Sequence, residues 1–297
     1  MIVVTGASGN IGKKLSEKLL SAGNKIRVVG RSKEHLQSLV EKGAEAFIGS
    51  LDDSAAMAKA FSGADAVFLM IPPSYTTNDF RSYQNKLGQS LTEAVEKSGV
   101  KHVVNLSSIG AHLPEKTGPI AGLYDHEQRL NKLKNVNVLH LRPTYFLENT
   151  LMNIDLIKKM GINGTPLNPQ MKMGMVATDD IAAEAATRLQ KRDFKGSSVK
   201  ELLGQRDVSM EEATQIFGKV IGKPDLKYVQ FPYQDAEKAM VGMGLSADVA
   251  RLFIEMNRGF NDGIIKPTQS RSAQTTTPTS IEEFAATFAK AYRGSNN

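Results

Sequence analysis

The sequence predicts an α/β protein with a Rossmann-type, doubly wound parallel sheet and a small C-terminal α/β cap domain. Two observations carry this prediction. Short β-branched and apolar runs alternate with amphipathic helical stretches through about residue 142, as in consecutive βαβ units. The first run leads directly into the glycine-rich segment TGASGNIG at residues 5–12, which opens a helical stretch.

Six runs are expected to be strands, because most of them are apolar on both faces, as buried parallel strands are. They span residues 2–5, 25–29, 44–48, 66–70, 102–106 and 136–141. Between them, leucines recur at helical spacing and give each intervening segment one apolar face. We therefore expect all six strands in one sheet covered by helices.

Beyond Pro143 the alternation becomes irregular. Thr178, Asp179 and Asp180 are expected to cap a helix. The remaining predicted segments are helices at residues 181–189, 211–221, 247–260 and 281–292, and a polar surface loop at 268–279. The predicted nucleotide domain is residues 1–148 plus about 171–203, and the predicted cap or substrate domain is about 149–170 plus 204–297.

Composition excludes several kinds of chemistry. The chain has 297 residues, no cysteine and five scattered histidines, so a disulfide framework, a thiolate nucleophile and a metal site are not expected. No secretory signal and no apolar run of roughly 20 residues is evident, which favours a cytoplasmic protein without a membrane partner. The net charge of +6 is dispersed, so direct nucleic-acid binding is not expected.

The glycine-rich segment predicts a dinucleotide site. Gly6 permits a tight turn, Gly9 lets the backbone approach a pyrophosphate, and Gly12 allows close packing of helix on strand. The helix N-terminus adds free N–H groups and a partial positive charge. The expected phosphate-binding residues are Gly6, Ala7, Ser8, Gly9, Asn10, Ile11 and Gly12.

The end of the second strand favours NADP(H) over NAD(H). An NAD-preferring protein typically has an acidic residue there for the adenosine ribose, whereas this sequence has Gly30-Arg31-Ser32-Lys33. Arg31 is expected to pair with a 2′-phosphate and to stack on the adenine, with Ser32 beside it.

Further motifs extend the pattern along the chain: Leu51-Asp52-Asp53, Ile71-Pro72-Pro73, LSSIG at residues 106–110 and LRPTYFLEN at residues 141–149. With the glycine turn, they resemble the NmrA-like branch of the atypical short-chain dehydrogenases/reductases, a family of NAD(P)H-binding reductases and redox-sensing regulators. The resemblance implies that Asp52 lies near the adenine. It also implies four residues along the ribose and nicotinamide half of the cofactor, namely Ile71, Pro72, Ser107 and Pro143.

The catalytic residues are less clearly marked. Better-known enzymes of this kind pair a tyrosine with a lysine four residues later, but Tyr124 is followed by Gln128. A neutral glutamine supplies no charge to lower the tyrosine pKa. Tyr124 and His126 are the candidate proton donors, Glu127 is an alternative orienting group, and the polar face of an amphipathic helix is the competing interpretation.

Two functions from different classes follow. The first is an NADPH-dependent oxidoreductase that reduces a quinone, dye or carbonyl-type small molecule. The second is a non-catalytic NAD(P) redox sensor that acts through a protein partner, which would explain the missing lysine. Six apolar residues could provide a lid for the substrate, although packing in the core is the role expected for most of them: Phe146, Met152, Met240, Met243, Phe253 and Met256.

Overall fold

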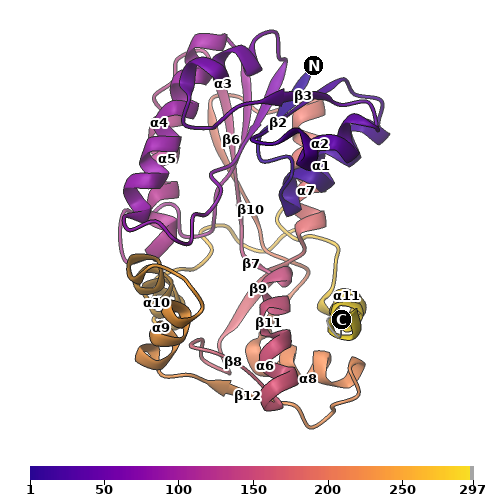
Figure 1. The fold of residues 1–297 in the computed structure, drawn as a ribbon, viewed down its shortest axis with the longest axis vertical. Helices are drawn as coiled ribbons and strands as arrows, with labels where there is room; N and C mark the ends of the chain where they lie inside the picture. Colours follow the sequence, from indigo (N-terminus) through magenta and orange to yellow (C-terminus); the bar gives the residue numbers. More distant parts are fainter. Residues whose placement is uncertain (295–297) are drawn as a thin grey trace.

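A seven-stranded parallel sheet forms one end of the molecule (Figure 1). It is seen in a computed structural model that describes residues 1–294. The strands run in the order β10-β6-β5-β4-β1-β2-β3. They are β1 (Ile2–Val4), β2 (Ile26–Gly30), β3 (Glu45–Ile48), β4 (Ala66–Leu69), β5 (His102–Leu106), β6 (Asn137–Pro143) and β10 (Ser197–Leu202). The prediction of a Rossmann-type α/β fold is confirmed, and β10 is a seventh strand that it missed.

The strand order reverses next to β1. The chain builds β2 and β3 on one side of β1, and then crosses to build β4, β5 and β6 on the other side. Connections at such a switch point leave in opposite directions, which opens a crevice at the carboxyl ends of β1 and β4. The glycine turn that follows β1 lies at this crevice.

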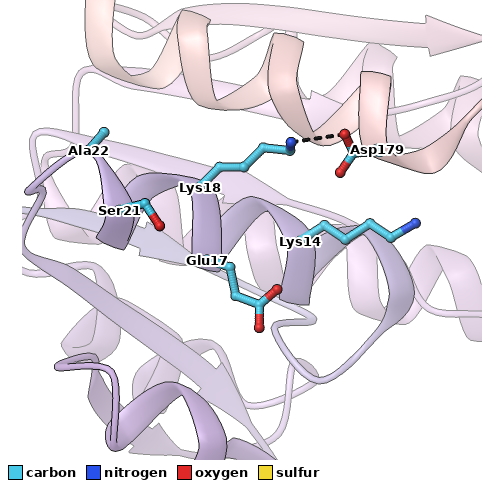
Figure 2. Close-up of a pocket in the computed structure, with 6 residues that line it drawn as sticks. All are labelled: Lys14, Glu17, Lys18, Ser21, Ala22 and Asp179. Carbon is cyan, nitrogen blue, oxygen red and sulfur yellow. Dashed lines mark hydrogen bonds and ion pairs between the residues drawn. The ribbon is translucent and has the colours of Figure 1, made fainter. Parts of the chain in front are cut away.

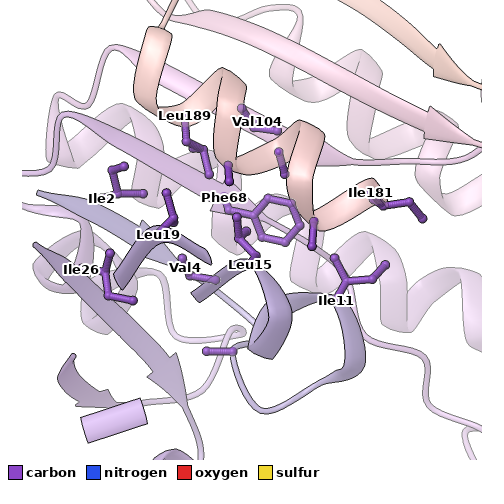
Figure 3. Close-up of a cluster of buried hydrophobic side chains, with 14 of the residues drawn as sticks. Ile2, Val4, Ile11, Leu15, Leu19, Ile26, Phe68, Val104, Ile181 and Leu189 are labelled. Atoms are coloured by element: carbon purple, nitrogen blue, oxygen red, sulfur yellow. The ribbon is translucent and has the colours of Figure 1, made fainter. Parts of the chain in front are cut away.

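Helices cover both faces of the sheet. One face is covered by α1 (Asn10–Ser21), α2 (Lys33–Val40) and α7 (Thr178–Lys191), and the other by α3 (Ser54–Phe61), α4 (Phe80–Ser98) and α5 (Ala121–Leu130). Figure 3 shows Leu15 and Leu19 of α1 and Ile181 of α7 packed over the sheet. Burying one such side chain stabilises the fold by on the order of 2 kcal/mol. Because these residues recur at helical spacing, they determine which face of each helix packs on the sheet.

The other end of the molecule is a smaller α/β cap with its own apolar core. Its helices are η2 (Leu147–Asn153), α6 (Ile154–Met160), α8 (Met210–Val220), α9 (Tyr233–Gly242), α10 (Ala247–Asn261) and α11 (Ile281–Gly294). Its strands are β7 (Tyr145–Phe146), β8 (Ile162–Thr165), β9 (Lys172–Val176), β11 (Asp207–Ser209) and β12 (Lys227–Gln230). In the cap core, Phe217 stacks on Phe288 with ring centroids 4.2 Å apart.

Helix α7 begins differently from the prediction. It starts at Thr178 itself, and the cap of its first turn comes from a distant residue, because Glu148 accepts the Thr178 N–H at 3.0 Å. Asp180 instead accepts hydrogen bonds from the N–H and hydroxyl of Thr279 at 3.0 and 2.7 Å. The three-residue cap expected from the sequence is therefore wrong. Thr178 lies inside the helix, Asp179 pairs with Lys18 of α1, and Asp180 bonds to Thr279.

The polar stretch 268–279 is a loop, but it is tied to the edge of the sheet. Glu201 of β10 is fully buried and accepts from the Thr268 N–H, the Thr268 hydroxyl and the Gln269 N–H. Gln269 in turn accepts the Glu201 N–H at 3.1 Å and donates to the Val199 carbonyl at 3.0 Å. The carboxylate thus fastens the strand to the segment that leads into α11.

Within residues 1–294, no helix is long and apolar enough to cross a membrane. No cluster of histidine, aspartate and glutamate side chains there is arranged to hold a metal ion.

Candidate functional site

The turn after β1 depends on its first and third glycines. Gly6 has φ +63°, in the left-handed region that favours glycine, and an added Cβ would lie 2.6 Å from the Met70 sulfur. At Gly12, an added Cβ would lie 2.2 Å from the Gly6 carbonyl oxygen. The helix therefore starts against the strand at a distance that only glycine permits.

The N-terminus of α1 is left open by this turn. Gly9 occupies the cap position, no side chain caps the helix, and its first turn contains no acidic residue. Helix geometry leaves the first backbone N–H groups without intrahelical acceptors. With the helix dipole, these N–H groups form a site suited to an anion such as a phosphate.

Charged groups gather at the carboxyl ends of β2 and β3. Arg31 is exposed and forms no ion pair or hydrogen bond with any described residue. The pKa of Tyr83 is raised mainly by burial, while the charge of Arg31 lowers it and the charge of Asp52 raises it. Asp52 pairs with Lys86 at 2.8 Å, and the hydrogen bond from Lys86 lowers the Asp52 pKa. Lys86 is a second cation that the sequence did not single out.

The residues expected along the rest of the cofactor lie where β4, β5 and β6 end. Ile71 and Pro72 follow β4, Ser107 follows β5, and Pro143 is the last residue of β6. Ser107 and Pro143 are linked through neighbouring backbone, because the Ser107 N–H donates to Leu141 and the Ile109 N–H donates to Pro143. The structure therefore brings these four residues to one edge of the sheet, the one formed by the carboxyl ends of its strands.

A buried ion pair lies directly beneath this edge. Glu127 of α5 is 1% exposed, and it accepts from the Arg142 Nε at 2.9 Å and from the Arg142 guanidinium NH2 group at 2.5 Å. The Ser107 hydroxyl donates to the same carboxylate at 2.5 Å. Since its proton is committed to Glu127, Ser107 is left with lone pairs that can only accept a hydrogen bond from a ligand.

His126 lies away from this edge. It is 1% exposed and packs against α4, where a Cβ added to Gly88 would meet its Nδ1 at 3.0 Å. Neither ring nitrogen makes a hydrogen bond of normal geometry within the described chain. Burial lowers the pKa of His126 to about 3, so the ring is neutral near pH 7. Burial as a neutral ring against α4 does not favour proton donation by His126, which stays a prediction.

Tyr124 is half-buried on α5, three residues before Glu127. Its hydroxyl has no hydrogen-bond partner among residues 1–294, and Gln128 one turn later is exposed. The lysine that would accompany a catalytic tyrosine is absent at this turn, and no described cation bonds to the hydroxyl in its place. Proton donation by Tyr124 stays a prediction.

The six residues expected to form an apolar lid are scattered over several elements. Met152 in η2 is 80% exposed and Met243 after α9 is 73% exposed. Phe146 packs against the core of the sheet and Met256 against the core of the cap. Phe253 stacks on Tyr75 of the loop after β4, with ring centroids 6.3 Å apart. Phe146 and Met256 thus pack against cores, as the competing interpretation expects, and the six residues do not form a single lid.

A surface hollow of about 450 Å³ lies between α1 and α7 (Figure 2). Its lining includes Lys14, Lys18 and Asp179, and the last two form an ion pair at 2.9 Å. Lys14 is likewise occupied, because it donates to Glu148 at 3.1 Å and to Thr178 at 2.6 Å. The hollow is thus lined by paired charges on the outside of the helix layer, away from the ends of β4 and β5.

Comparison with known proteins gives one family match and several relatives. The NmrA-like family model matches residues 1–285. A (4-alkanoyl-5-oxo-2,5-dihydrofuran-3-yl)methyl phosphate reductase of Streptomyces griseus is 27% identical over 241 residues, 81% of this chain and 80% of that protein. An uncharacterized oxidoreductase of Bacillus subtilis, YesF, is 26% identical over 292 residues, 97% of this chain and 95% of that protein.

Solved structures share the fold at low identity. The NADPH complex of an NADPH-dependent quinone oxidoreductase from Escherichia coli has a TM-score of 0.81 and 21% identity over the whole of both chains. The NADP(H) complex of the Citrobacter sp. triphenylmethane reductase has a TM-score of 0.83 and 19% identity over 97% of this chain and 100% of that one. With the family model matching nearly the full length, this chain belongs to the NmrA-like family.

Proposed function

We propose that this protein is an NADPH-dependent oxidoreductase that reduces a quinone, dye or carbonyl-type small molecule. The observation that carries the proposal is the open N-terminus of α1 behind the turn at Gly6 and Gly12, with Arg31 exposed at the end of the next strand. The turn suits a pyrophosphate, and an unpaired guanidinium suits a 2′-phosphate. The relatives named above, two of them solved with NADPH or NADP(H), support the same cofactor class.

In this proposal the protein mainly binds and orients. When bound, NADPH would supply the hydride, and the residues at the ends of β4, β5 and β6 would orient it toward the acceptor. Ser107 accepts a hydrogen bond from a donor on the cofactor or substrate, because its own hydroxyl hydrogen is already donated to Glu127. Tyr124 or solvent supplies the proton to the reduced acceptor. The cap, which contains residues 149–170 and 204–297, is the proposed substrate domain.

The first experiment is a titration of purified protein with NADPH, NADP, NADH and NAD, followed by NADPH oxidation against quinone and dye acceptors. Arg31→Ala is expected to weaken NADPH binding by about tenfold or more, because a charge-assisted contact to the 2′-phosphate is lost. NADH lacks that phosphate, so its affinity should stay near the wild-type value. Equal losses for both cofactors would contradict the assignment of Arg31, and absence of binding by wild-type protein would refute the dinucleotide site.

A second function, an NAD(P) redox sensor without catalysis, is favoured by one observation. Gln128 stands where a catalytic lysine would be expected, and the Tyr124 hydroxyl is unpartnered within residues 1–294. A sensor must bind the oxidised and reduced cofactor with different affinities, since only differential affinity shifts a conformational equilibrium. Tight binding with no turnover of any acceptor, and a clear NADPH/NADP difference, would favour this function over the reductase.

A further inference from the structure

The loop between β4 and α4, residues 70–79, is fastened to the cap by Ser246. This residue immediately precedes α10 and donates its backbone N–H to the Tyr75 carbonyl at 2.9 Å. Its hydroxyl donates to the Thr77 carbonyl at 2.5 Å and accepts from the Val249 N–H at 3.1 Å. The group that caps α10 therefore also fixes the path of the loop.

Asp248 makes a second connection two residues further on. One carboxylate oxygen accepts the backbone N–H of Phe80, the first residue of α4, at 2.9 Å. The other oxygen accepts from Arg251 at 2.8 Å. The Asp248 side chain is 22% exposed and the Arg251 side chain 58% exposed, so the contact to Phe80 is the better shielded of the two. The middle of the loop and the first residue of α4 are thus bonded to the N-terminal cap and first turn of α10.

Apolar packing holds α10 in this position. Phe80, Val249 and Leu252 form a small buried cluster of their own. On the adjoining side, a Cβ added to Gly118 would lie 2.0 Å from the Leu252 carbonyl oxygen, so the backbone there lies directly against the helix. Because both sides are in close contact, α10 cannot shift without moving the loop or the segment before α5.

We infer that α10, through Ser246 and Asp248, positions the loop that carries Ile71 and Pro72, and thereby sets the affinity for the dinucleotide. The inference rests on the proposed function, which places these two residues against the cofactor. The start of the loop is held by α4, because the Tyr83 hydroxyl donates to the Pro72 carbonyl at 3.1 Å. Ser246 and Asp248 are positioning residues, and α10 and cofactor stabilise each other reciprocally.

The test compares three variants by NADPH titration. Asp248→Ala removes the acceptor for the Phe80 N–H and is expected to raise the NADPH dissociation constant about tenfold, as the loss of one charge-assisted hydrogen bond would. Asp248→Asn keeps an acceptor oxygen and should restore most of the affinity. Arg251→Ala removes the exposed ion pairs of Arg251 with Asp248 and Glu255 but keeps the Asp248 contact to Phe80, so its affinity should stay within about twofold of wild type. Wild-type affinity in Asp248→Ala would overturn the inference.

A measurement on the wild-type protein tests the same inference without depending on variants that could misfold. Bound NADPH should slow amide hydrogen exchange in residues 247–253 and leave exchange in α8, a cap helix outside this contact, unchanged. No protection of residues 247–253 would overturn the coupling even if NADPH binds tightly. If wild-type protein binds no dinucleotide, the proposed function fails instead, so the two failures are distinguishable.

Discussion

At the residue scale, Gly12 is the position most intolerant of a side chain in the glycine turn. Gly12→Ala would place a Cβ 2.2 Å from the Gly6 carbonyl oxygen. Because that oxygen belongs to the backbone, the clash can be relieved only if the backbone moves. We expect a stability loss of about 1–3 kcal/mol and much weaker NADPH binding. Thermal unfolding and titration test this result.

The matched control is Gly242→Ala. A Cβ at this position in α9 meets nothing within 4 Å, so stability should be unchanged or slightly higher. If Gly12→Ala behaved like Gly242→Ala, the close approach of α1 to the turn would be refuted.

His126 makes stability depend on acid pH. Burial lowers its folded-state pKa to about 3, below the value of about 6.5 of an unfolded histidine. The unfolded chain therefore takes up the proton first as the pH falls, and stability is lost below about pH 6.5 at about 1.4 kcal/mol per pH unit. His140, whose pKa burial lowers to about 4, acts in the same direction.

His126→Leu should flatten this slope, because it removes one of the two buried imidazoles. Urea unfolding at pH 7 and pH 5 measures the difference, which should be smaller in the variant by about 2 kcal/mol. His35→Gln on the exposed face of α2 is the control and should retain the wild-type slope. Retained turnover in His126→Leu would agree with its position away from the crevice, whereas an unchanged slope would contradict its burial as a neutral ring.

At the scale of elements, the buried Glu127–Arg142 ion pair connects α5 to β6. Glu127→Gln leaves Arg142 as a buried charge without its partner, and such losses cost about 3–5 kcal/mol. The neighbouring pair Asp125–Arg81 has an arginine side chain that is 44% exposed, so Asp125→Asn should cost no more than about 1 kcal/mol. Denaturant unfolding compares the two variants, and equal costs would mean that solvent reaches Glu127.

Elements with strong periodicity were predictable and the others were not. Most of the six predicted strands are apolar on both faces, as is typical of buried parallel strands, and several of the helices between them repeat leucine at helical spacing. β10 was missed because its sequence, SSVKEL, is polar and lies at an edge, where only part of each face is buried. The cap strands of two to five residues give too short an alternation to detect.

The site shows the same contrast. The glycine turn is contiguous in sequence, so its spacing indicates its geometry. Glu127 and Arg142 are 15 residues apart on different elements, and no local pattern distinguishes them from surface charges. Asp248 and Phe80 are 168 residues apart, so only the fold brings them together.

At the scale of the whole molecule, Glu201 connects the sheet to the segment leading into the last helix. Its carboxylate is 0% exposed and accepts three donors from Thr268 and Gln269. Glu201→Gln keeps one acceptor oxygen for the two N–H groups but removes the negative charge that strengthens all three hydrogen bonds, at a cost of about 1–3 kcal/mol. Hydrogen exchange across residues 266–277 should accelerate with the loss of stability.

The control for this variant is Glu96→Gln, an exposed carboxylate on α4. It should leave both stability and exchange at residues 266–277 unchanged. Normal exchange there in Glu201→Gln would show that the loop is held by other contacts.

The hydrogen bonds of Gln269 have one more consequence. The side-chain amide both accepts and donates at the outer edge of β10, as the backbone of a neighbouring strand would. An open strand edge is a template on which another polypeptide can add by β-pairing, the first step of many aggregation reactions. The Gln269 side chain occupies the Glu201 N–H and the Val199 carbonyl, two backbone groups with which an added strand would pair. With this one side chain in place, we expect the outer edge of β10 to resist β-pairing with another polypeptide.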